Sequence, residues 1–186
     1  MHHITMRLAI ACVVVSATAA AAAPFNFTVN YKINNVDFLA RAWYGDAHLY
    51  VGPTVPASIH TAFNFTISSP SRSPLYIEPA TPGAKVPDQT FLAVNNAPGA
   101  SDPLFFSSSA AGLPEGGLSL WARYANLLFP ILDDGSIQSY FYLGETEVEG
   151  TYIVKWKQGG VRQQSLATTT GLGGLGVQLT VLDPTL

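Results

Sequence analysis

The stretch FNFTVNY, residues 25–31, alternates apolar and polar side chains without a break. Successive side chains of a β-strand point to opposite faces, so the phenylalanines, valine and tyrosine share one face and the asparagines and threonine share the other. A helix would scatter both sets around its circumference, because its period is about 3.6 residues. The stretch therefore predicts a strand with one buried face and one solvated face.

Similar strand-like runs recur along the chain, and turn-forming sequences such as YGD, VGP, DDGS, EGT and QGG separate them. After the first 23 residues, no stretch keeps a helical apolar pattern for about twelve residues. The spacing predicts an all-β fold, a single-domain antiparallel β-sandwich or a barrel-like variant of roughly ten strands. The runs span residues 25–31, 36–43, 48–51, 62–68, 89–94, 104–107, 118–124, 127–132, 137–143, 151–157, 162–168 and 177–182.

The first 23 residues are organised like a secretory signal peptide. Arg7 supplies a positive charge, an apolar run follows over residues 8–15, and an alanine-rich tract offers small residues for cleavage between Ala19 and Ala23. The apolar run is short for a bilayer span, although an uncleaved anchor or a buried helix is the alternative. Residues 1–23 are therefore predicted to direct the rest of the chain to the secretory route.

Residues 24–186 are expected to form one domain, because a chain of this length can bury a sufficient core. A proline- and serine-rich segment at about residues 68–88 interrupts the strand pattern. Proline cannot donate to a β-ladder, so this segment is predicted to be a surface crossover or an edge rather than a central strand. The part before it, residues 24–67, is too short to hold a separate core.

Composition narrows the classes of function. Cys12 is the only cysteine and lies in the predicted signal peptide, so the mature chain is expected to have no disulfide, no cysteine nucleophile and no thiolate zinc site. The formal net charge of −3 gives no electrostatic case for binding nucleic acid or an anionic membrane. The chain is therefore expected to be free and soluble after export, without a cofactor.

Two N-x-T triplets accompany the export signal. Asn26 begins Asn-Phe-Thr in one predicted strand, and Asn64 begins Asn-Phe-Thr in another. The alternating pattern places both asparagines on the polar face of their strands, where a glycan has room. Asn26 and Asn64 are therefore predicted N-glycosylation sites, and an unmodified polar strand face is the alternative.

The richest charged stretch is GETEVEGTYIVKWKQGG, residues 144–160. With a three-residue loop centred on Gly150, Glu145 faces Lys155 across a hairpin and the apolar residues face one another, with Trp156 on the apolar side. A two-residue loop breaks these matches. The stretch therefore predicts a hairpin with a wet charged face, and the alternative is a catalytic or metal-binding cluster of its three glutamates.

Other candidate motifs have structural interpretations. The GLGGLG string at residues 171–176 lacks the following helix of a dinucleotide site and predicts a turn before the last strand. The DDGS string at residues 133–136 is typical of a tight turn. Asp46, His48 and His60 are the only combination that suggests a two-histidine metal site, and their spacing matches no known metal motif, so no metal is expected.

Tryptophans offer the best indication of binding in the composition. Trp43 and Trp121 occur in similar settings, LARAWYGD and LSLWARYAN. Exposed aromatic rings stack on sugar rings, whereas tryptophans at alternating strand positions more often fill a core. Trp43 and Trp121 are therefore candidate carbohydrate-stacking residues, with core packing as the alternative.

Three segments carry a resemblance to a known family. They are INNVDFLARAWYGDAHLYVG, AVNNAPGASDPLFFSSSAAGLPEGGLSLWARY and SYFYLGETEVEGTYIVKWK, and they span most of the chain after residue 23. In this order they resemble the secreted cell-wall glycoproteins of filamentous fungi typified by the phialide-associated wall protein. Such proteins usually carry cysteines near the first and last of these segments, and this chain has none there. The resemblance implies a non-enzymatic wall or surface protein, sometimes one that a host senses, and it transfers no catalytic residue.

These observations favour a secreted, N-glycosylated, non-enzymatic protein of a cell wall or extracellular matrix that acts by surface or carbohydrate binding. The expected partner is a cell-wall polysaccharide or a host surface. The alternatives are a secreted effector or elicitor acting on a host, and a secreted hydrolase or hydrolase inhibitor. A cleft that gathers two or more of Asp46, His48, His60, Asp133 and Glu145 would favour the hydrolase.

Overall fold

The computed structural model describes residues 24–33, 36–68, 72–159 and 177–182, and these residues form an all-β fold. One short 3₁₀ turn, η1 (Ala110–Gly112), accompanies thirteen strands in this part of the chain. The strands are β1 (Phe25–Ile33), β2 (Val36–Gly45), β3 (His48–Val51), β4 (Ala62–Ile67), β5 (Ser73–Pro79), β6 (Phe91–Asn95), β7 (Phe105–Ser107), β8 (Gly117–Leu118), β9 (Leu120–Tyr124), β10 (Leu127–Pro130), β11 (Phe141–Glu145), β12 (Tyr152–Trp156) and β13 (Gln178–Leu182).

Some sequence predictions fall outside the described residues. They are the signal peptide at residues 1–23, the strand at residues 162–168 and the glycine-rich turn at residues 171–176. Among the residues that are described, no helix is long and apolar enough to cross a membrane.

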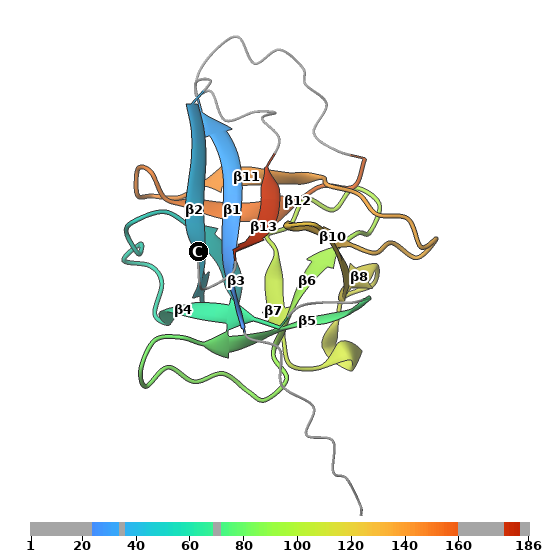
Figure 1. Ribbon diagram of the computed structural model, residues 1–186, viewed down its shortest axis with the longest axis horizontal. Helices are drawn as coiled ribbons and strands as arrows, with labels where there is room; N and C mark the ends of the chain where they lie inside the picture. Colours follow the sequence, from blue (N-terminus) through green and yellow to red (C-terminus); the bar gives the residue numbers. More distant parts are fainter. Residues whose placement is uncertain (1–23, 34–35, 69–71, 160–176, 183–186) are drawn as a thin grey trace, which may run out of the picture.

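All strand pairings are antiparallel, and together they join the thirteen strands into one sheet that curls into a ring (Figure 1). Strands β3, β2, β4, β5, β6 and β7 pair in succession, and β7 pairs back to β3. A second circuit runs through β1, β13, β10, β9, β5 and β4. The all-β antiparallel prediction is confirmed, while the strands form one continuous sheet rather than two separate ones.

Strand β5 corrects the prediction for the proline-rich crossover. It runs through that segment and pairs with β4, β6 and β9, so part of the crossover is a central strand. Its prolines lie near the two ends, Pro74 beside the first residue and Pro79 at the last. The two prolines, which lack a backbone N–H, therefore lie at the ends of the ladder, where a strand tolerates proline.

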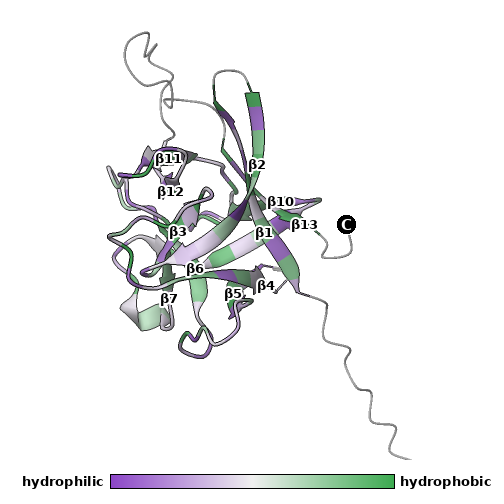
Figure 2. Cartoon of the chain, turned by 90° about the vertical axis from the view of Figure 1, so that its left-hand side faces the viewer, coloured by the Kyte–Doolittle hydropathy of each residue, from purple (hydrophilic) through white to green (hydrophobic). Residues whose placement is uncertain are grey.

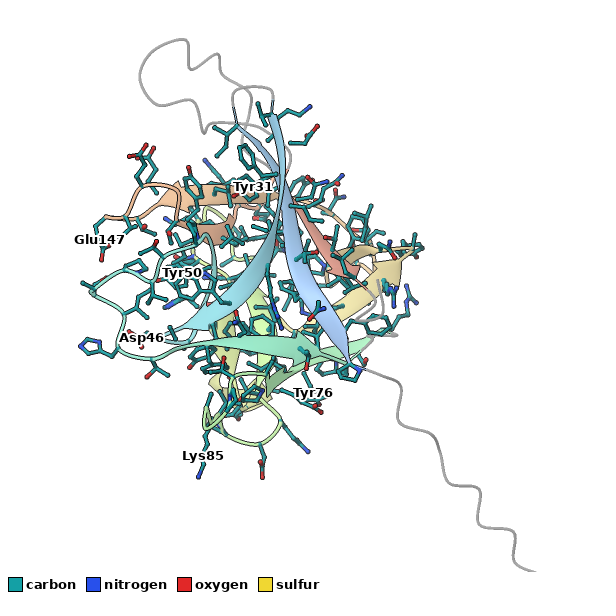
Figure 3. The ribbon with its side chains drawn as sticks, turned by 60° about the vertical axis from the view of Figure 1, so that its left-hand side comes forward. Tyr31, Asp46, Tyr50, Tyr76, Lys85 and Glu147 are labelled. Carbon is teal, nitrogen blue, oxygen red and sulfur yellow. The ribbon has the colours of Figure 1, made fainter. Side chains whose placement is uncertain are left out.

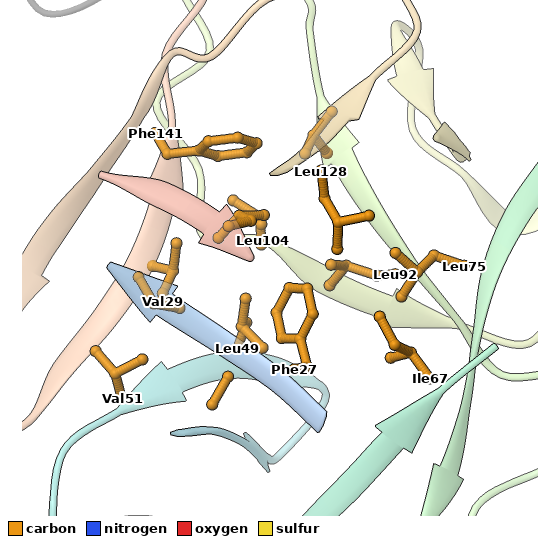
Figure 4. Packing of buried hydrophobic residues seen from close by; sticks show 14 of the residues in the cluster. Phe27, Val29, Leu49, Val51, Ile67, Leu75, Leu92, Leu104, Leu128 and Phe141 are labelled. Atoms are coloured by element: carbon orange, nitrogen blue, oxygen red, sulfur yellow. The ribbon is translucent and has the colours of Figure 1, made fainter. Parts of the chain in front are cut away.

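The interior of the ring holds one hydrophobic cluster. Strand β4 shows how the sequence builds it, because Phe63, Phe65 and Ile67 are buried while Asn64 between them is exposed. Side chains from nearly every strand meet there (Figure 4). The largest fully buried side chains include Trp121, Trp156, Phe27, Phe65, Leu49, Ile67, Leu75, Leu92, Leu104 and Leu128.

The polar face of β1 is less solvated than its pattern predicts. Strand β1 lies between β2 and β13, and Thr28 is buried there. The hydroxyl oxygens of Thr28 and Thr180 lie 2.6 Å apart, directly across the ladder. A threonine pair therefore satisfies two hydroxyl groups where flanking strands exclude water.

The β11–β12 hairpin exists, but its predicted register is wrong. Glu145 pairs with Tyr152, and Lys155 pairs with Tyr142, so the connection spans residues 146–151. The Thr146 hydroxyl donates to the Thr151 carbonyl oxygen at 2.8 Å. This side-chain hydrogen bond stabilises a six-residue connection in place of the predicted three-residue loop. The prediction for Trp156 is confirmed, since its side chain is fully buried.

Candidate functional site

The two predicted glycosylation sites lie in different surroundings. Asn64 is exposed on the outer face of β4, whereas Asn26 is half-buried where β1 meets β4 and β13. Asn64 lies opposite Trp43 in the β2–β4 ladder, so both side chains project from the same face. Of the two asparagines, Asn64 is the more exposed.

The two candidate stacking tryptophans are both buried. Trp121 has no exposed surface, and its indole N–H donates to the Leu92 carbonyl oxygen at 2.9 Å. Trp121 therefore offers no ring face to a sugar. It belongs to the core, which was the alternative to carbohydrate stacking. Trp43 retains 6% exposure, donates to the Gly52 carbonyl oxygen at 3.1 Å and stacks on Tyr50. Trp43 and Asn64 line a hollow of about 270 Å³.

The three glutamates of the charged hairpin are exposed, and their loop surrounds a hollow of about 330 Å³. Glu147 accepts hydrogen bonds from the hydroxyl and the backbone N–H of Ser58, at 2.5 and 3.4 Å. These bonds, the hydroxyl above all, hold the pKa of the Glu147 carboxyl below its ordinary value. In Figure 3 Glu147 extends outward at the same side as Asp46 and Tyr50. Glu147 thus braces two loops, which is a structural role.

Asp46 organises the turn between β2 and β3. Its carboxylate accepts the backbone N–H groups of His60 and Thr61 at 2.9 and 2.8 Å, and the His60 imidazole lies 3.5 Å away. The two backbone bonds lower the pKa of Asp46. His48 contacts the Asp46 carbonyl oxygen instead of the carboxylate. Within the described residues no three histidine, cysteine or acidic side chains gather as a metal site.

A different hollow brings together residues that the sequence did not connect. We name it the β6–β7 hollow, and its volume is about 480 Å³. Its walls come from the β2–β3 turn, the end of β6, the loop between β6 and β7, β7 itself and the segment before β8. It is lined by Ala47, His48, Asn95, Asp102, Pro103, Phe105, Phe106 and Pro114.

Strand pairing explains why these side chains meet. His48 lies opposite Phe105, and Ala93 of β6 also lies opposite Phe105, so the three share one face of the sheet. Asn95 follows Ala93 by two residues and therefore projects from that face too. The pairing of β3 with β7 thus sets an imidazole, an aromatic ring and an amide side by side.

A polar pair stands at the rim of the β6–β7 hollow. The Asn95 side-chain N–H donates to the exposed Asp102 carboxylate at 2.7 Å, while the other amide atom of Asn95 accepts the Ala97 backbone N–H at 3.0 Å. Because both ends of the Asn95 amide are engaged, its orientation is fixed. The carboxylate of Asp102 keeps lone pairs for a ligand.

The loop that carries Asp102 is held on the core. The Trp156 indole N–H donates to the Asn96 side-chain oxygen at 3.2 Å, and the Trp156 backbone N–H donates to the Asp102 carbonyl oxygen at 3.0 Å. Asn96 in turn donates its backbone N–H to the Gly116 carbonyl oxygen at 2.9 Å. A fully buried side chain therefore positions the rim of the hollow before any ligand arrives.

His48 completes the polar wall. Its Nδ1 lies 3.1 Å from the Asp46 carbonyl oxygen, which can only accept, so a hydrogen bond between them requires the proton on Nδ1. The hollow therefore combines polar side chains at His48 and Asp102 with apolar surface at Phe105 and two prolines. Of the five residues named for a hydrolase cleft, only His48 lines it.

No sequence signal marked this set, because its members are distant along the chain and share no motif. The available signal was indirect: Asn95 and Asp102 flank a glycine- and proline-containing loop, and such loops often carry binding residues. Comparison with protein-family models, with curated proteins and with solved structures gives no match.

Proposed function

We propose that this protein is a secreted glycoprotein that binds carbohydrate through the β6–β7 hollow and thereby associates with a cell wall or extracellular matrix. The observation that carries the proposal is the Asp102 carboxylate, fixed by Asn95 at the rim of a partly apolar hollow that contains Phe105. The signal-like segment at residues 1–23 and the accessible sequon at Asn64 support the export route.

The chemistry of the hollow suits a sugar. A sugar ring presents neighbouring hydroxyl groups, which donate to a carboxylate, and a C–H face, which packs on an aromatic ring. Asp102 supplies the first kind of contact and Phe105 the second. The volume lies within the range of about 300–1,000 Å³ that small-ligand sites occupy.

Binding fits the hollow better than glycoside hydrolysis does. Hydrolysis commonly requires two carboxyl groups on opposite sides of the scissile bond. Among the described residues that line the β6–β7 hollow, Asp102 is the only carboxylate. The proposal is therefore recognition of a polysaccharide or oligosaccharide without cleavage.

The test is binding of the mature protein to a glycan array and to isolated wall polysaccharides. Asp102→Ala and Phe105→Ala are expected to weaken retention by about tenfold or more, since each removes one of the two contacts. The backbone bond from Trp156 to Asp102 survives the first change, so folding is preserved. Asp134→Ala removes an exposed carboxylate from a turn elsewhere and is the matched control. Equal retention of all variants, or no retention of the unmodified protein, would contradict the proposal.

A further inference from the structure

Among the described strands, the outer half of β2, residues 36–41, has a pairing partner on one edge only. It pairs with β1, whereas the inner half, residues 42–45, pairs with β3 on one side and contacts β4 on the other. In the part of the chain that the structure describes, no strand pairs with the β3-side edge of the outer half. The β1–β2 ribbon projects from the body of the ring (Figures 1 and 2).

Apolar side chains on this ribbon face solvent. Val36, Phe38 and Leu39 are 55%, 41% and 57% exposed, and all three belong to the outer half of β2. Val36 and Phe38 share one face, where Phe38 stacks on Tyr31, and Leu39 lies on the other face. An open edge with apolar residues is a template for pairing with another strand.

The turn at the far end of β2 shows which backbone groups reach the open edge. Asp46 and Ala47 form a two-residue turn with φ values of 42° and 66°, so Gly45 and His48 are a hydrogen-bonded pair. Alternate residues of β2 then direct N–H and C=O groups toward the β3 side. In the outer half of β2, the residues that direct these groups toward the open edge are Arg41, Leu39 and Asp37.

Asp37 and Arg41 carry opposite charges and lie at equal distances along β2 on either side of Leu39. When two copies of the outer half run antiparallel with Leu39 opposite Leu39, Asp37 of each copy lies opposite Arg41 of the other. Moving the centre by one residue to Phe38 places Asp37 opposite Leu39 and leaves both charges unmatched. We propose that the chain forms a symmetric dimer by pairing the open edges of β2, with Leu39 on the two-fold axis.

The surroundings of Asp37 and Arg41 are compatible with this dimer. Asp37 contacts Lys32 on the neighbouring strand at 3.4 Å, and its side chain remains 72% exposed, so it can accept a second cation. Arg41 is exposed. The pairing would turn two ribbons into a four-stranded sheet and cover apolar surface on both faces. This inference concerns a different surface from the β6–β7 hollow and does not depend on carbohydrate binding.

Charge reversal tests the proposed register. Sedimentation velocity or light scattering over a range of concentrations is expected to show a dimer of the unmodified protein. Asp37→Arg places like charges opposite each other and is expected to raise the dissociation constant about tenfold or more, and Arg41→Asp does the same. A mixture of the two single variants regains complementary pairs and is expected to form a heterodimer. The double variant Asp37→Arg/Arg41→Asp is expected to recover the homodimer.

Glu78→Arg reverses an exposed charge on β5 and is the control for net charge. Thermal unfolding of each variant shows whether it is folded. A monomeric unmodified protein at high concentration would overturn the dimer. Single variants that dimerise like the unmodified protein, or folded single variants that fail to associate when mixed, would overturn the register.

Discussion

The two halves of β2 both contain large apolar side chains and have opposite environments. The outer half, with Val36, Phe38 and Leu39, is exposed, while the inner half, with Ala42 and Trp43, is buried. The difference follows from neighbouring strands: the inner half lies between two strands over the core, and among the described strands the outer half pairs with β1 alone. Both halves form a strand, but the number of neighbouring strands decides whether the apolar side chains of each half are buried in the core.

The largest expected effect separates a buried phenylalanine of the core from the exposed phenylalanine of the outer half of β2. Phe27 of β1 is fully buried, and Phe38 of β2 is 41% exposed. Phe27→Ala is expected to lower the free energy of unfolding by about 3–5 kcal/mol, because it leaves a cavity in the core. Phe38→Ala is expected to cost about 1 kcal/mol or less. Urea denaturation of dilute protein measures both, and equal losses would contradict the difference in packing between the core and the outer half of β2.

A second test probes how tightly the inner half is packed. A Cβ on Gly45 would lie 2.8 Å from ring atoms of both Trp43 and Tyr50. Gly45→Ala is therefore expected to destabilise the protein by about 1–3 kcal/mol, since two stacked rings must move. In Gly112→Ala the new Cβ would meet its nearest atom at 3.9 Å, so this control should change stability little. A Gly45→Ala variant as stable as the control would show that the Trp43 and Tyr50 rings can move aside at little energetic cost.

A smaller effect is expected from the threonine pair between β1 and β13. Thr28→Val or Thr180→Val removes one hydroxyl and leaves its partner buried without that bond, at a cost of about 1 kcal/mol. The double variant is expected to lose less than the sum of the single losses. Denaturation of all four proteins gives the coupling energy. Strict additivity would mean that the two hydroxyl groups do not stabilise each other.

The smallest effect concerns the turn that ends the inner half. Backbone N–H bonds lower the pKa of Asp46 in the folded protein, so its ionised form favours folding above the ordinary pKa of an aspartate. This contribution is lost as the pH falls through the folded pKa. Asp46→Asn is therefore expected to lower stability slightly at neutral pH and to match the unmodified protein in strong acid.

Asparagine also tolerates the positive φ of position 46, so backbone strain does not enter the comparison. Unfolding free energies at several pH values provide the measurement. A stability difference that stays constant from neutral pH to strong acid would contradict the carboxylate as its cause.

Much of the fold was predictable from local pattern. The alternation in β1 and β4 placed Phe27, Phe65 and Ile67 inside, and the buried Trp156 was assigned to the correct face. Register was less predictable: side-chain matching favoured Glu145 opposite Lys155, yet Thr146 closes a longer loop and pairs Glu145 with Tyr152. A hydroxyl-to-backbone bond within a loop leaves no periodic signal in the sequence.

The candidate site was harder to predict than the fold. Trp43 and Trp121 attracted attention by residue type, but both indole N–H groups donate to backbone carbonyls and both rings are buried. His48 and Asn95 come together because β3 and β6 both pair with β7, and Trp156 of β12 holds Asp102 beside them. These contacts join segments that are far apart along the chain, and local patterns carry no information about them.

The sequence by itself determined that the chain forms β-strands, which side chains of most strands point inward, and where several turns lie. These properties depend on neighbours two residues apart, and the alternation records them directly. Only the tertiary structure decided which strands are adjacent, which apolar residues remain exposed on β2, and which polar groups surround the β6–β7 hollow. Those outcomes depend on contacts between distant segments, whose pairing follows from the packing of the whole core.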